Sequence, residues 1–218
     1  MNLPFTVDQF YGVFRAYNEA VWPAQWFLLA LACVASLLVA RPRRWTGIAT
    51  SAILGILWLW LGLAYHLAFF AAINPLAHAF AAVSVIGGLV FLWQGVVRRR
   101  LDFRLSRSVR STAGVALVVF ALAVYPAWSI YAGHRYPDLP TFGLPCPTTI
   151  FTVGVLSFLV APYPRSAVAV PVLWCLIGAQ AAFLLGVRQD LGLLAAAAVG
   201  VTLLALPSTS VIQRHGAS

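Results

Sequence analysis

Five side chains able to bind a metal ion or a polar ligand are expected at the same depth, near the outer side of a membrane. They are three histidines, one aspartate and one cysteine, namely His66, His78, His134, Asp138 and Cys146. Neutral imidazoles together with a thiolate suit a soft or borderline transition metal ion. The sequence therefore predicts an outward-facing polar pocket for a small ligand or metal ion. The ordinary alternative is that each histidine is a hydrogen-bonded residue near a helix end.

The stretch GLPCPTTIFT, residues 143–152, places Cys146 between two prolines. Because Pro147 suits the first turn of a helix, Cys146 is expected at the N-cap, where the helix dipole favours a thiolate. The same helix start, with Thr148, Thr149 and the nearby Arg135, offers a site for a small anion.

The composition indicates where these residues must sit. Of the 218 residues, 62% are hydrophobic and 9% are charged, which is too apolar for one water-soluble core. We expect an all-α integral membrane protein, a single bundle of about seven transmembrane helices. Runs long enough to cross a bilayer occur at about 22–40, 46–72, 76–97, 112–133, 147–161, 166–186 and 191–209.

The arginines predict the orientation of this bundle. The net charge is +9, but the arginines lie between the apolar runs, so we discard nucleic acid as a partner. With the N-terminus outside, three arginines face out (Arg15, Arg135 and Arg188) and eleven face in. The positive-inside rule then predicts a multi-pass protein of a bacterial inner membrane with a cytoplasmic C-terminus. The inner set is Arg41, Arg43, Arg44, Arg98, Arg99, Arg100, Arg104, Arg107, Arg110, Arg165 and Arg214.

Three segments are predicted: an interfacial amphipathic helix (1–21), a polytopic transmembrane bundle (22–209) and a cytoplasmic tail (210–218). Thr6 and Gln9 form a capping-box pattern, and Phe10, Phe14 and Tyr17 recur at helical spacing. This helix either anchors the chain on the membrane surface or covers an outer cavity. The fifth run has only about fifteen residues, so the preceding outer loop HRYPDLPTFGLPCP is predicted to be re-entrant.

Several function classes lack their signatures. The chain has no lysine for a retinal Schiff base, no CxxC pair and no GxxxxGK[ST] loop. All five acidic residues are expected in loops or at helix ends. Because none is expected within a membrane span, the sequence does not support ion pumping.

Two alternatives to a ligand-binding or transport protein stay open. One is a structural or accessory subunit, with a homo-oligomer or membrane-complex partner. The other is a membrane-embedded enzyme with Cys146 as nucleophile and His134 or His78 as base. The lipid bilayer is an expected partner in every case.

Four segments resemble a known family: LPFTVDQFYGVFRAYNEAVWPAQ, YHLAFFAAINP, FLWQGVVR and GHRYPDLPTFGLPCPTTIFTVGVL. They are similar to a family of bacterial multi-spanning membrane proteins catalogued as a domain of unknown function, the one numbered 6064. The resemblance covers nearly the whole chain and implies an inner-membrane location and a similar span count. It implies no activity, and no catalytic residue follows from it.

Overall fold

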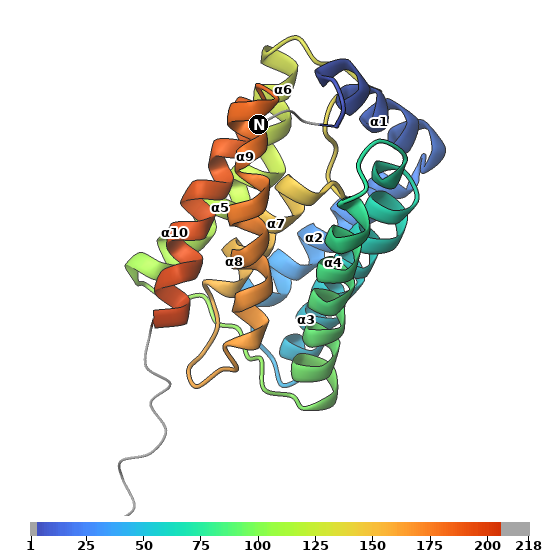
Figure 1. Cartoon of the computed structure of the whole chain (residues 1–218). Coiled ribbons are helices and arrows are strands. Elements are labelled where there is room, and N and C mark those ends of the chain that lie inside the picture. The colour runs from blue at the N-terminus through green and yellow to red at the C-terminus, as the bar shows by residue number, and fades with distance from the viewer. Residues whose placement is uncertain (1–3, 206–218) are drawn as a thin grey trace, which may run out of the picture.

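The structure, a computed structural model, describes residues 4–205, and within this range every regular element is a helix (Figure 1). The C-terminal tail predicted at 210–218, with Arg214, lies outside the described residues. The elements are α1 (Val7–Ala20), α2 (Ala24–Ala40), α3 (Thr46–Trp60), η1 (Leu61–Leu67), η2 (Phe70–Ala72), α4 (Ala77–Phe91), η3 (Leu92–Val97), α5 (Val109–Val119), η4 (Phe120–Val124), α6 (Tyr125–Tyr131), α7 (Pro145–Leu156), α8 (Ser166–Gly178), α9 (Gln180–Leu184), η5 (Arg188–Leu191) and α10 (Gly192–Ala205).

Fewer helices are long enough to cross a membrane than the sequence predicted. Five are long and apolar enough within the described residues: Thr46–Ala72, Ala77–Val97, Val109–Tyr131, Ser166–Leu184 and Arg188–Ala205. A sixth span requires α1 and α2 to count as one, although they meet at a bend of 89°. The predicted count of seven is therefore not confirmed, because α2 has 17 residues and α7 has 12.

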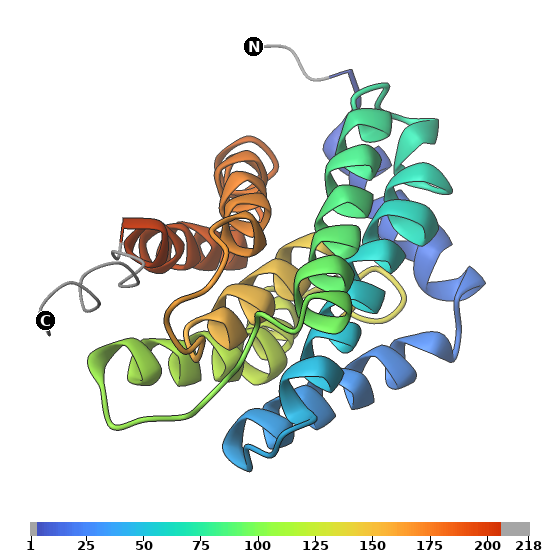
Figure 2. The ribbon, with the colours of Figure 1, turned by 90° about the horizontal axis from the view of Figure 1, so that it is seen from below.

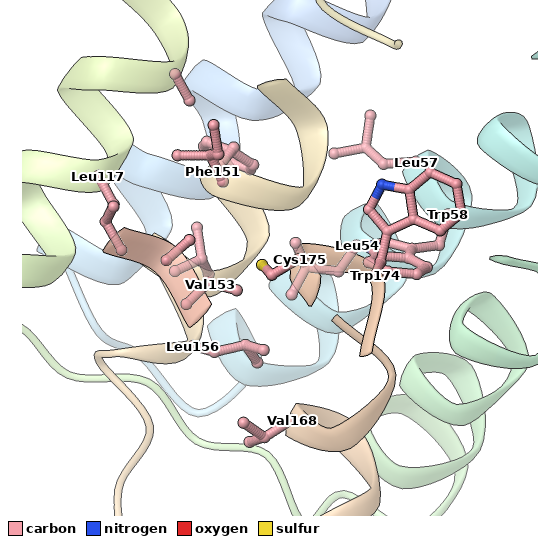
Figure 3. Close-up of a cluster of buried hydrophobic side chains, with 14 of the residues drawn as sticks. Leu54, Leu57, Trp58, Leu117, Phe151, Val153, Leu156, Val168, Trp174 and Cys175 are labelled. Carbon is pink, nitrogen blue, oxygen red and sulfur yellow. The ribbon is translucent and has the colours of Figure 1, made fainter. Parts of the chain in front are cut away.

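Helix α7 is short and is surrounded by protein. Every one of its residues except Cys146 is buried. Its main neighbours are α5, α8 and α10, and the view from below shows it inside the bundle (Figure 2). Trp58 of α3 is fully buried and donates its indole N–H to Thr152 Oγ1 of α7 at 3.0 Å. The cluster drawn in Figure 3 joins α7 to three neighbours through Leu54, Leu57, Trp58, Leu117, Phe151, Val153, Leu156, Val168, Trp174 and Cys175.

Close backbone contact holds α3 against α4, and it predicts the effect of one substitution. A Cβ on Gly88 would meet Leu59 Cγ at 2.8 Å and the Gly55 main-chain oxygen at 2.9 Å. Since that backbone cannot rotate away, Gly88→Ala should lower the free energy of unfolding by about 2 kcal/mol. Thermal unfolding in detergent measures the change. Gly12→Ala is the control, since nothing lies within 4 Å of its Cβ and helix propensity favours alanine. A loss of similar size in both variants would contradict the packing argument.

The two ends of the bundle differ in charge. One end, here the arginine end, carries the connections 41–45, 98–108 and 157–165, in which most of the arginines lie (Figure 1). These connections contact one another: Arg104 N–H donates to Phe158 O, and Arg110 Nη2 donates to Leu159 O at 2.7 Å. The other end, here the α1 end, carries α1, η2, the loop after α6 and the turn before α10 (Figure 1).

Candidate functional site

Helix α1 lies over the α1 end of the bundle and packs inward. Its capping box is confirmed: Gln9 N–H donates to Thr6 Oγ1, and Thr6 N–H donates to Gln9 Oε1. The predicted aromatic face of this helix is buried against other parts of the protein. Phe10 stands edge-on to Phe70, and Tyr17 stands edge-on to Tyr65. The aromatic face of α1 is therefore turned toward the rest of the protein.

A buried asparagine makes the main hydrogen bonds that hold the loop 132–144 against α1. It runs from the end of α6 past α1 to the start of α7 (Figure 1). Asn18, which is fully buried, donates from Nδ2 to Pro137 O at 2.6 Å and to Leu139 O at 2.9 Å. Its Oδ1 accepts from Thr141 Oγ1 at 2.7 Å, and its main-chain oxygen accepts from Tyr136. Asn18 therefore fixes the course of the loop over several residues.

Two of the predicted ligand residues are used to hold the same loop. Asp138 forms a bidentate ion pair with Arg15 of α1, with N–O distances of 2.8 and 2.7 Å. The hydrogen bond to Asp138 and its charge raise the pKa of Arg15. His134 stacks on Tyr11 with ring centroids 4.4 Å apart. Asp138 and His134 thus have a structural role, because both attach the loop to α1.

A pocket of about 710 Å³ lies between the bend of α1 and α2, the η4–α6 segment and the loop. Its lining is mainly apolar and aromatic, and it includes Trp22, Trp26, Tyr125 and Pro147. Among the described residues that line the pocket, Glu19 is the one with a charged side chain. Volume and lining resemble those of small-molecule sites, which are concave and apolar with a few fixed polar groups.

Gln25 supplies a polar group of this pocket that has no protein partner. Its side chain is 7% exposed, and its Nε2 donates to Asn18 O at 2.8 Å. Its Oε1 is buried and accepts no hydrogen bond from the described residues. A buried acceptor without a donor is costly, so the Gln25 side chain gains a hydrogen bond when it turns toward a donor in the pocket.

Asp190 is a buried acid beside the pocket that the sequence did not reveal as a site residue. It lies in η5, at the start of the apolar segment Arg188–Ala205, but it is only 1% exposed and accepts a hydrogen bond from the Tyr125 hydroxyl at 2.5 Å. The Cys146 thiol is a second hydrogen-bonding neighbour of the carboxylate. Since Tyr125 also lines the pocket, one side chain separates the pocket from this acid. The order Arg-Gln-Asp before a helix rich in alanine and leucine gives no signal that the carboxylate turns inward.

The environment of Cys146 corrects the predicted thiolate. The helix α7 begins at Pro145 with Leu144 as N-cap, so Cys146 lies inside the first turn. The helix begins two residues earlier than predicted because Pro145, like Pro147, suits the first position of a helix. A carboxylate beside the sulfur is an acceptor for S–H and repels a thiolate.

The remaining predicted residues do not join these. His66 is buried between η1 and its neighbours, with Nδ1 3.3 Å from Ser84 Oγ, while His78 is exposed and contacts Pro75 O. Arg135 is exposed, whereas Thr148 and Thr149 are buried within α7. In the part of the chain that the structure describes, no three His, Cys, Asp or Glu side chains are gathered where they could hold a metal ion.

The fold and this site define a helical protein with at least five membrane-length apolar helices and a pocket near one end. The chain belongs to a family of unknown function, DUF6064, whose model matches residues 7–215. No curated protein and no solved structure matched the chain.

Proposed function

We propose that this chain is a multi-pass membrane protein that binds a small, largely apolar ligand in the pocket beneath the α1–α2 bend. The observation that carries the proposal is the unpartnered Gln25 Oε1 in the lining of a pocket of about 710 Å³. An apolar lining stabilises the body of the ligand, and the single free acceptor orients a donor group on it.

The charge distribution supports an orientation for this site. The arginine-rich connections lie at the end opposite α1 (Figure 1). By the positive-inside rule, the arginine end faces the cytoplasm of a bacterium, and the pocket lies in the outer half of the inner membrane. A ligand then reaches it from the outer leaflet or from the periplasm. The exposure of Trp22 and Trp26, at 57% and 62%, supports entry from the lipid side.

A photoreactive alcohol tests binding directly. Purified protein in phosphatidylcholine nanodiscs is irradiated with 3-azioctanol, and the labelled peptides are mapped by mass spectrometry. We expect labelling of the segments around Trp22 and Tyr136, both of which line the pocket. Gln25→Leu should reduce this labelling about fivefold, because a neutral hydrogen bond contributes about 1 kcal/mol.

Gln94→Leu is the matched control. Its Oε1 is also buried without a partner, but Gln94 lies near Ser166, away from the pocket. The control should leave the labelling of the pocket unchanged. Labelling spread evenly over the exposed faces of the helices, or equal labelling in both leucine variants, would contradict the proposed site.

A further inference from the structure

The pocket has a negative character in a chain with a strong positive charge. The whole sequence has 14 arginines and five acidic residues. Yet the charged side chain that lines the pocket is Glu19, and Asp190 lies one side chain behind the wall, bound to Tyr125. Within residues 4–205, the ion pair that forms joins Arg15 to Asp138. The charge of Arg15 also acts on Glu19, but among these residues no ion pair joins Glu19 or Asp190 to a cation.

The aromatic residues at the mouth have the same electrostatic preference. Trp22 stands edge-on to Trp26, with ring centroids 6.5 Å apart, and edge-on to Tyr136, at 5.9 Å. All three line the pocket. The face of an aromatic ring carries negative charge density and attracts an ammonium group. An acidic rim, an acid behind the wall and aromatic faces are together complementary to a cation and unfavourable to an anion.

We propose that the ligand of this pocket is an organic ammonium ion, a protonated amine on an apolar body. This rests on the proposed function and names the class of its ligand. The N–H of a protonated amine donates to Gln25 Oε1, the acceptor without a protein partner, once this side chain turns toward the pocket. Glu19 supplies the counter-charge. The apolar body lies against the aliphatic part of the lining, including Leu29 and Leu122. A quaternary ammonium has no N–H and leaves Gln25 unpaired.

Isothermal titration of four eight-carbon probes into protein-loaded phosphatidylcholine nanodiscs tests this class. The probes are octylammonium, trimethyloctylammonium, 1-octanol and octanoate, and empty nanodiscs correct for partition into lipid. We expect octylammonium to bind about tenfold more tightly than octanol, the combined effect of charge and cation–π attraction. Trimethyloctylammonium should fall between them, and octanoate should not bind. Equal affinity for octylammonium and octanol overturns the ammonium assignment.

Glu19→Gln separates charge from shape. We expect it to weaken octylammonium about threefold and to leave octanol unchanged, because Glu19 is exposed and its field is partly screened. Asp8→Asn is the matched control: Asp8 is an exposed acid of the same helix that does not line the pocket, so neither probe should be affected. If both substitutions weaken octylammonium equally, the effect is one of net charge and the assignment fails.

The same titration distinguishes failure of this assignment from failure of the proposed function. If octanol binds and loses affinity in Gln25→Leu while octylammonium has no advantage, the pocket stands and its ligand class is wrong. If neither probe binds beyond the empty nanodiscs, the pocket itself is not a binding site. Nanodiscs with phosphatidylethanolamine identify the source of the ammonium. A lower apparent affinity for octylammonium there shows that the lipid headgroup occupies the site, and an unchanged affinity indicates a free amine.

Discussion

Replacing Asn18 with leucine is expected to lower the free energy of unfolding by about 4 kcal/mol and to abolish binding in the pocket. Asn18 is fully buried, and its side chain makes two donor contacts with the loop and accepts from Thr141. Leucine has a similar branched shape but removes all three, leaving the carbonyls of Pro137 and Leu139 without a donor. The loop then keeps only its peripheral contacts with α1, the Arg15–Asp138 ion pair and the Tyr11–His134 stack, and the wall of the pocket that it forms is no longer fixed.

Thermal unfolding in detergent and limited proteolysis of the loop measure the two consequences. Asn74→Leu is the matched control: Asn74 is also a buried asparagine, 6% exposed, but its Oδ1 accepts one hydrogen bond, from Leu76 N–H at 3.1 Å. It should lose about 1 kcal/mol and leave the loop resistant to protease. If the two variants lose equal stability, or if the loop in Asn18→Leu resists cleavage, Asn18 does not hold the loop.

The sequence predicted the elements of this protein better than their partners. The capping box at Thr6 and Gln9 depends on neighbouring residues, and it is present as predicted. The direction in which the aromatic face of α1 turns depends on η1 and η2, about fifty residues away, and pattern alone left anchor and cover open. The same limit applies to α7, whose twelve residues are almost all buried because protein surrounds the helix on all sides.

The candidate site shows this limit more strongly. His134, Asp138 and Cys146 were predicted at one end of the bundle, and all three contact neighbours there. Their partners are Tyr11, Arg15 and Asp190, and residue types alone could not identify these pairs. Gln25 belongs to the candidate site because its Oε1 has no hydrogen-bond donor, and Asp190 belongs to it because its carboxyl group forms no ion pair with a cation of the described residues. Both are properties of tertiary contacts, which a single sequence does not contain.

Replacing Asp190 with asparagine is expected to change stability and binding in opposite directions. A buried carboxylate without a cation is costly to the free protein, so Asp190→Asn should raise the free energy of unfolding by about 1 kcal/mol. Asparagine still accepts from the Tyr125 hydroxyl through Oδ1. The same change removes the acid behind the pocket wall, where screening by water is weak. Octylammonium should therefore bind about threefold more weakly, a loss of about 0.7 kcal/mol.

Two further variants decide whether the charge or the fold is responsible. Tyr125→Phe keeps the carboxylate but removes its 2.5 Å donor, so it should lower stability where Asp190→Asn raises it. Asp102→Asn removes an exposed acid at the arginine end and should leave octylammonium affinity unchanged. A rise in stability with unchanged affinity would show that Asp190 takes no part in binding. A fall in both would show that the carboxylate is a structural hydrogen-bonding group, because only an uncompensated charge destabilises the empty pocket while attracting a cation into it.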